Sequence, residues 1–283
     1  MHFVKYHALG NDYLVLDARA VGPALAPALV WRLCDRHRGV GADGILLRAY
    51  DDGTHRVRIY NPDGSEAEKS GNGLRILARA LWDLGLVRGA PFDVETAGGR
   101  VTCRVLDDGR RVVVDMGRVT FDSAAIPVRG ARRDVLDEEM DVGGRTLRYS
   151  AASIGNPHCV LVRDAISADE ARALGPLIEV EPRFPNRTNV QFVQVLAPGR
   201  LAVEIWERGA GYTLASGSSA CAAAAVAHRL GLAAADVTVV MPGGELAIGI
   251  APDFGVRMTG PVARVAEGSV ADELLRDVAG RPS

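Results

Sequence analysis

Short motifs recur along this chain at a nearly constant separation, and that repeat constrains the fold more than any other feature of the sequence. Leu-Gly-Asn at 9–11 returns as Ile-Gly-Asn at 154–156, 145 residues later. Two further motifs return after 146 residues, VRIYN at 57–61 as VEIWE at 203–207 and SGNG at 70–73 as SGSS at 216–219. Matches in one register indicate a chain built from two equivalent halves.

Each half is predicted to combine antiparallel strands with one well-marked helix. Residues 101–105 and 111–114 flank Asp-Asp-Gly, which is typical of a β-hairpin. Leu74, Leu77 and Leu81 share one face of a helix predicted over 70–85, and a second helix is expected from about residue 220 to Leu230.

These features predict an α+β fold of two pseudo-symmetric domains, each strand-rich with a central helix, with the active site in the cleft between them. The predicted N-terminal half covers residues 1–118 and is joined by the tail 262–283. The predicted C-terminal half covers residues 119–261.

Composition limits the possible partners and cofactors. The formal net charge is -2, so no basic excess exists to bind nucleic acid or an anionic membrane surface. The first residues lack a signal-peptide pattern, and no apolar stretch approaches the roughly 20 residues of a membrane span. The four cysteines show no ligand-type spacing, so we expect a reduced, cytoplasmic protein without a metal site.

The two predicted helix starts suit an anionic ligand. A helix start offers free N–H groups and a partial positive charge, and two equivalent starts could hold one carboxylate. Ser70 and Ser216 would then face opposite sides of the attached carbon, an arrangement that stereochemical inversion requires. Each serine could instead be an ordinary N-cap.

The motifs together resemble those of the diaminopimelate epimerase family. The resemblance rests on residues 61–66 with 70–75, on 207–211 with 216–218, and on 7–12, 155–158 and Asn189. It implies an isomerase that needs no cofactor and inverts the α-carbon of an amino acid, with a small-molecule substrate and a homodimeric assembly.

The resemblance also implies a set of site residues. The reacting carboxylate would rest on the N–H groups of Gly71, Asn72, Gly217 and Ser218. The non-reacting end of the substrate would be held by Asn11, Asn61, Asn156, Asn189, Glu207 and Arg208. Arg208 offers a planar fork to a carboxylate, and Glu207 suits an ammonium group.

The sequence departs from the family pattern at the reacting residues. Family members carry cysteine where this chain has Ser70 and Ser216, whereas His158 and Glu207 are retained. A serine hydroxyl is a poor base unless another group takes its proton. We therefore expect Ser70 to act with His158 and Ser216 to act with Glu207.

Three explanations of the serines stay open. The chain could be a natural branch with altered chemistry, such as a lyase, a cyclase or another isomerase. It could be an impaired relative that only binds substrate, or an epimerase with engineered serines. Further departures at Tyr212 and Ser219 argue against engineering. Gly44 is also a departure, and Gly44 and Tyr212 are expected to touch the pocket region.

Overall fold

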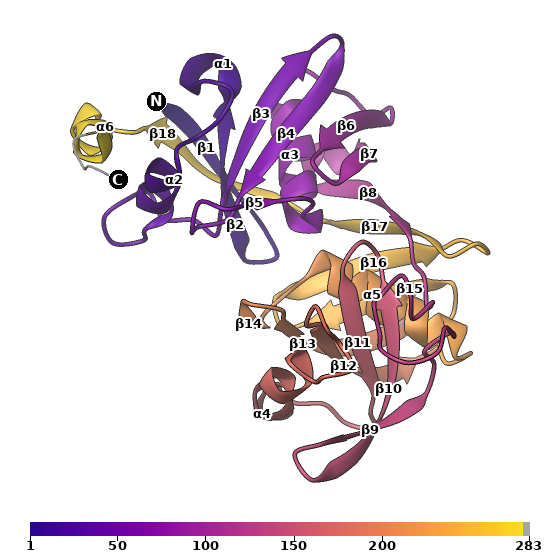
Figure 1. The fold of residues 1–283 in the computed structure, drawn as a ribbon. Helices are drawn as coiled ribbons and strands as arrows, with labels where there is room; N and C mark the ends of the chain where they lie inside the picture. The colour runs from indigo at the N-terminus through magenta and orange to yellow at the C-terminus, as the bar shows by residue number, and fades with distance from the viewer. Residues whose placement is uncertain (280–283) are drawn as a thin grey trace. The chain divides into compact units, whose positions relative to one another are not determined.

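The computed structural model describes residues 1–279 and divides the chain into two compact units. Unit 1 contains Met1–Val114 and the chain from Gly260, and unit 2 contains Asp115–Thr259. Figure 1 shows both units as ribbons, with the chain ends in unit 1. None of the helices within residues 1–279 has the length and apolar character needed to span a bilayer.

Unit 1 is a sheet with one buried helix and three shorter helices. Its main strands are β1 (His2–Ala8), β2 (Asn11–Asp17), β3 (Ile45–Asp51), β4 (Thr54–Tyr60), β6 (Phe92–Thr96), β7 (Gly99–Leu106) and β18 (Ala263–Ser269), with the short β5 (Glu66–Ala67) beside β4. The helices are α1 (Ala18–Val21), α2 (Pro27–Cys34), α3 (Gly71–Asp83) and α6 (Asp272–Ala279). Strand β18 pairs with the free edge of β1, so the end of the chain completes the sheet of the first half.

Unit 2 repeats this order of elements. Its strands are β9 (Glu138–Val142), β10 (Arg145–Ser153), β11 (Pro157–Val162), β12 (Asn189–Ala197), β13 (Arg200–Glu207), β14 (Gly211–Thr213), β15 (Asp236–Met241) and β16 (Gly244–Ile250), with helices α4 (Ala168–Glu179) and α5 (Gly217–Arg229). Strands β8 (Arg111–Arg118) and β17 (Gly255–Pro261) cross the boundaries of the units.

The pairing of the strands is also repeated. In unit 1, β2 runs parallel to β3, β3 antiparallel to β4, and β4 parallel to β6. In unit 2, β11 runs parallel to β12, β12 antiparallel to β13, and β13 parallel to β15. The predicted α+β class, with two similar strand-rich halves, is confirmed.

The central helix of each unit is buried because of its composition. In α3 the apolar face carries Leu74, Leu77 and Leu81, all at most 1% exposed. In α5 all residues from Ala220 to Ala227 are fully buried, as expected for a helix without a polar face. Small side chains there let neighbouring strands approach the helix closely.

The first helix prediction and the hairpin prediction agree with the structure, whereas the second helix starts earlier than expected. Strands β7 and β8 pair around a 3-10 turn (η1, Asp107–Gly109), as the hairpin motif predicts. Helix α5 begins at Gly217 instead of near residue 220. Glycine and serine have low helix propensity, but the packing of the buried alanine run outweighs that preference over the first turn.

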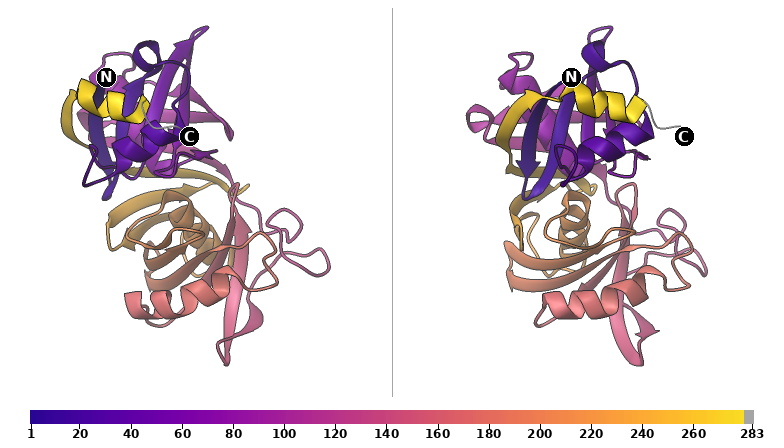
Figure 2. Two further views of the ribbon diagram at one scale, coloured as in Figure 1. Left: turned by 60° about the vertical axis from the view of Figure 1, so that its left-hand side comes forward. Right: turned by 90° about the vertical axis from the view of Figure 1, so that its left-hand side faces the viewer.

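The outer helices of unit 1 close its second hydrophobic layer. Leu274 and Leu275 of α6 pack against the cluster that contains Val30 and Leu33 of α2. Figure 2 shows α6 lying beside α2 in both views. The C-terminal segment therefore contributes a strand and a helix to a core that starts at residue 1.

Candidate active site

The start of α3 places Ser70 at its N-cap. Ser70 has extended backbone angles, and its Oγ accepts a hydrogen bond from the Gly73 N–H at 3.0 Å. The first-turn N–H groups of Gly71 and Asn72 have no acceptor within the helix, as at any helix start. Ser70 therefore caps the helix and stands beside N–H groups that suit an anion.

Two of the predicted binding asparagines lie together at this helix start. Asn72 Nδ2 donates to Asn11 Oδ1 at 3.1 Å, and Arg75 donates to Asn72 Oδ1 at 2.8 Å. Asn11 Nδ2 in turn donates to Asp43 at 3.1 Å. Because Arg75 is fully buried, this chain of contacts fixes both amides in one orientation.

Asn11 is held through Asp43 by a cluster of charged side chains. Asp12 accepts a hydrogen bond from Arg36 and forms an ion pair with Lys5, both at 2.7 Å, and Arg36 also binds Asp43. Burial of Asp12 opposes its ionisation, but Arg36 and Lys5 hold the pKa of this carboxyl well below its usual range. These contacts hold the start of β2 next to the residues that precede β3.

Asn61 has a different environment from the other asparagines of unit 1. Its Nδ2 donates to Ser65 Oγ at 3.0 Å, and its carbonyl accepts from Gly64 at 2.9 Å. Asn61 therefore stabilises its own turn. A substrate that contacts the Asn61 amide, as proposed, would compete with Ser65 for it.

The start of α5 holds a serine in a different state. Ser216 is the N-cap residue and is 4% exposed, but its side chain makes no capping hydrogen bond. The Glu207 carboxyl contacts the Ser216 hydroxyl instead. Burial raises the pKa of Glu207, and the contact with Ser216 opposes that shift. The Ser216 side chain thus does not cap the helix and contacts an acid instead.

His158 is the most deeply buried titratable residue of the predicted site. Its Nε2 lies 2.9 Å from Asn156 Oδ1, and its Nδ1 is buried without a hydrogen-bond partner among residues 1–279. Burial lowers the pKa of His158 to about 3, while a contact with Gln191 acts in the opposite direction. The imidazole is therefore neutral at pH 7.

Asn189 and a buried glutamate fix the segment that carries Arg208. Asn189 Oδ1 accepts from the Arg208 N–H at 3.0 Å, and its Nδ2 donates to the Pro157 carbonyl at 2.9 Å. Glu179 accepts from the Gly209 N–H at 2.8 Å and from Trp206 Nε1 at 2.7 Å. Glu179 lies at the end of α4, remote in sequence from the motifs, and sequence reasoning missed it.

The remaining predicted residues of unit 2 form the first turn of α5. Gly217 is buried and Ser218 is half-buried, so both N–H groups belong to the helix start. Just beyond them, Gln191 donates to Ser219 Oγ at 3.0 Å and ties β12 to the helix.

Tyr212 packs on the face of β13 and β14 opposite to Glu207. Its hydroxyl donates to Glu204 at 2.6 Å, and the Arg172 guanidinium lies 4.0 Å from the centre of its ring. Tyr212 pairs with Trp206 across β13 and β14 and therefore shares its face, whereas Glu207 points to the other face. The departure at Tyr212 belongs to the packing against α4 and does not touch the Glu207–Ser216 pair.

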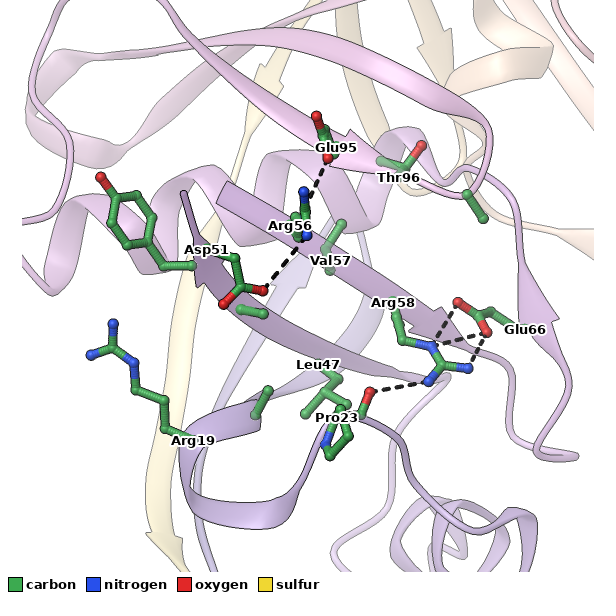
Figure 3. A pocket seen from close by; sticks show the side chains of 14 residues that line it. Arg19, Pro23, Leu47, Asp51, Arg56, Val57, Arg58, Glu66, Glu95 and Thr96 are labelled. Atoms are coloured by element: carbon green, nitrogen blue, oxygen red, sulfur yellow. Dashed lines mark hydrogen bonds and ion pairs between the residues drawn. The ribbon is translucent and has the colours of Figure 1, made fainter. Parts of the chain in front are cut away.

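A cavity of about 520 Å³ in unit 1 is lined by none of the predicted site residues. Figure 3 shows that Arg56 and Arg58 face acidic partners. Arg58 binds Glu66, and Arg56 binds Glu95 at 2.9 Å. Within residues 1–279, no group of three histidine, cysteine, aspartate or glutamate side chains is arranged to hold a metal ion.

Comparison with solved structures defines the class of fold. A probable proline racemase from Agrobacterium radiobacter K84 superposes with a TM-score of 0.69, covering 96% of this chain and 93% of that one, at 17% sequence identity. The chain therefore shares the fold of a two-domain racemase.

Sequence comparison defines the family. The family model for diaminopimelate epimerase matches residues 3–121 and 150–265. Diaminopimelate epimerase 2 from Nostoc sp. is 51% identical over 277 residues, which is 97% of both chains, and the diaminopimelate epimerase of Moorella thermoacetica is 43% identical over 274 residues, 95% of this chain and 98% of that one. The chain belongs to the diaminopimelate epimerase family.

Proposed function

We propose that this protein is an epimerase that inverts the α-carbon of diaminopimelate, from the L,L to the meso form, without a cofactor. The observation that carries the proposal is the state of Ser216, a buried serine at a helix start that leaves the helix uncapped and contacts the acid Glu207. A serine in that state can exchange a proton through its neighbour.

The proton transfer at Ser216 follows from this contact. Ser216 Oγ accepts the α-proton while its own proton passes to the Glu207 carboxylate, and the electron pair of the broken C–H bond remains on the substrate. In the reverse direction Glu207 returns the proton through Ser216. The N–H groups at the start of α5 stabilise the charge that develops on the substrate carboxylate.

Ser70 and His158 are proposed for the second proton transfer. Ser70 occupies the equivalent helix start in unit 1, and His158 is kept neutral by burial, so the imidazole can accept a proton. The two residues belong to different units of the chain.

The groups proposed to hold the non-reacting end of the substrate are already oriented. Asn156 is engaged with His158, and Asn189 holds the backbone of Arg208. The Arg208 guanidinium is anchored by the Asn186 carbonyl at 3.1 Å and is otherwise exposed, so its fork is available to a carboxylate.

The test is proton NMR of the purified protein in D₂O with L,L-diaminopimelate. Loss of the α-proton signal with formation of the meso isomer is the expected result, and Ser216→Ala should lower the exchange rate by about 100-fold or more. Glu245→Gln, at a surface ion pair with Arg200, is the matched control and should leave the rate unchanged. Absence of exchange on this substrate would refute the proposal.

The serine pair also favours a second candidate, a lyase, cyclase or other isomerase of the same fold. That reaction would convert a related amino acid into a product of different mass or unsaturation, which mass spectrometry of the same mixtures detects. A non-catalytic binder would instead raise the melting temperature with ligand and show no turnover.

We further propose that the enzyme acts as a homodimer in the cytoplasm, in lysine biosynthesis. The family resemblance supports the assembly and the pathway, and the composition supports the compartment. Light scattering on the purified protein tests the assembly, because a monomer mass at micromolar concentration would contradict it.

A further inference from the structure

Tyr13 lies against the serine that caps α3. Its ring is buried on β2, and its hydroxyl oxygen is 3.4 Å from Ser70 Oγ, with either oxygen able to donate. The distance exceeds that of a fully formed O–H···O bond. Such contacts shorten in many enzymes when substrate binds.

The internal repeat assigns Tyr13 a counterpart. The offset of 145 residues that relates Asn11 to Asn156 relates Tyr13 to His158. The strand register agrees, because Leu14 lies beside Ile45 in the parallel pair β2–β3 as Cys159 lies beside Val190 in β11–β12, each residue at the same offset. Each unit therefore carries one side chain capable of proton transfer at the same position of the same strand.

The absence of a side chain at Gly44 leaves room for the ring of Tyr13. A Cβ atom at Gly44 would lie 2.6 Å from Tyr13 Cε1 and 2.6 Å from the Tyr60 carbonyl oxygen. Neither atom belongs to the flexible end of a long side chain, so a residue larger than glycine would force the ring away from Ser70. The ring of Tyr13 thus explains why residue 44 is glycine in this chain.

Ser70 lacks the acid partner that Ser216 has. The position equivalent to Glu207 is Asn61, whose amide cannot take a proton and is bonded to Ser65. Ser70 Oγ already accepts from the Gly73 N–H, which supports negative charge on that oxygen. Within unit 1, the neighbour of Ser70 that can exchange a proton is Tyr13, through its phenol.

We propose that Tyr13 is the proton-relay partner of Ser70 and positions its hydroxyl for the second proton transfer. This inference rests on the proposed epimerase function. When Ser70 protonates the substrate carbon, its Oγ–H bond breaks and a C–H bond forms with the electron pair of the carbanion. The Tyr13 proton then moves to Ser70 Oγ, and the negative charge ends on the phenolate.

The opposite direction returns the same atoms. Ser70 Oγ takes the α-proton while its own proton passes to the phenolate, and the electron pair stays on the substrate. A phenol is suited to this exchange because its ordinary pKa near 10 makes it a much better proton donor than an aliphatic alcohol. Tyr13 acts only through Ser70.

A double-mutant cycle separates relay from packing. Tyr13→Phe should lower kcat by about 100-fold with KM within about threefold, because the ring and its packing remain. In a Ser70→Cys background the same change should alter kcat by less than about threefold, since a thiol exchanges its own proton without help.

Tyr6→Phe is the matched control. Tyr6 pairs with Tyr13 across β1 and β2, and its hydroxyl contacts Asp83 at the far end of α3. Its rate should equal that of the wild type. The relay is overturned if Tyr13→Phe retains full activity, if its loss is equal with serine or cysteine at residue 70, or if Tyr6→Phe loses as much.

A second readout does not depend on turnover. With ¹³C-tyrosine label, the Cζ signal of Tyr13 should move in Ser70→Ala, while that of Tyr6 should not. A wild type that fails to exchange diaminopimelate refutes the proposed function, and the Tyr13 signal then decides the relay alone. An unmoved signal overturns the relay, and a moved signal supports it.

Discussion

Burial acts on the two titratable residues of unit 2 in opposite directions and with the same result. It lowers the pKa of His158 to about 3 and raises that of Glu207, because burial disfavours the charged form of either group. The imidazole is neutral at pH 7, and the carboxyl holds its proton to higher pH than an exposed glutamate. The neutral imidazole can accept a proton, and a carboxyl with a raised pKa gains and loses its proton closer to neutral pH. Both groups are thus suited to proton transfer to or from carbon.

The pH dependence of the reaction should report the shift at Glu207. In the direction in which Ser216 removes the α-proton, Glu207 must be ionised, so kcat/KM should rise with pH as this carboxyl loses its proton. Because its pKa is raised, this acidic limb should lie above the range of an ordinary glutamate. Glu207→Gln should abolish the limb and lower the plateau by about 100-fold.

The measurement is a profile of kcat/KM against pH for the wild type and Glu207→Gln. Glu204→Gln provides a control that should keep the limb, because Glu204 lies three residues before Glu207 in β13 and is bonded to Tyr212. Persistence of the same limb in Glu207→Gln would assign it to another group.

At the scale of elements, the two helix starts differ in the use of their serines. Ser70 caps α3 through Gly73, whereas Ser216 makes no capping bond to α5. Loss of a capping side chain costs about 1 kcal/mol. Ser70→Ala should therefore lower the free energy of unfolding by about that amount, and Ser216→Ala should lower it by less.

Urea unfolding at pH 7 followed by circular dichroism tests this difference. Both variants should lose α-proton exchange, so the two substitutions should differ in their effect on the free energy of unfolding and not in their effect on activity. Equal destabilisation would mean that Ser216 supports its helix in a way that the hydrogen bonds do not reveal.

The segment after β13 depends on Glu179. This carboxylate is 4% exposed and accepts from Trp206 and Gly209, next to the Arg208 that is proposed to bind the substrate carboxylate. Glu179→Gln keeps the shape but weakens these charge-assisted bonds. Since Arg208 acts in binding, KM should rise about tenfold, equivalent to roughly 1.4 kcal/mol, with kcat nearly unchanged.

Steady-state kinetics on folded protein measure this split between KM and kcat. Glu170→Gln, on the same helix α4 and paired with Arg163, is the control and should leave KM unchanged. A fall in kcat without a change in KM would place Glu179 in the chemical step.

Local patterns in the sequence predicted some of these elements and not others. The hairpin at η1 and the apolar face of α3 are fixed by neighbouring residues, so they could be read directly. The contacts of Glu179 and Tyr13 join residues 30 and 57 positions apart, and no local pattern reveals them. The first turn of α5 was missed because its stability comes from burial and not from propensity.

Across the whole molecule, the repeat explains where proton-transfer groups stand. Tyr13 and His158 occupy one equivalent position, and Asn61 and Glu207 occupy another. The two units therefore share one backbone arrangement while their side chains at equivalent positions differ. Inversion of a carbon requires such a difference, because one face of the carbon needs a proton donor and the other a proton acceptor. The repeat could be found from sequence, but the contact between Tyr13 and Ser70 required the structure.

The division into units also predicts how pieces of the chain fold. Unit 2 is one continuous segment with its own buried hydrophobic cluster, which includes Leu161 and Phe192. Unit 1 is discontinuous, because β1 needs β18 along one edge, from His2 opposite Ser269 to His7 opposite Ala263. Residues 115–259 alone should therefore unfold cooperatively on heating, whereas residues 1–114 alone should show no cooperative transition.

Circular dichroism melts of the separate segments check this expectation. Joining residues 260–283 to residue 114 through a short flexible linker should restore a cooperative transition to the first segment, since it returns both β18 and the packing of Leu274 and Leu275. A cooperative transition in residues 1–114 without that addition would mean that an unpaired β1 edge is tolerated. The fold of unit 1 would then be complete before the end of the chain is made.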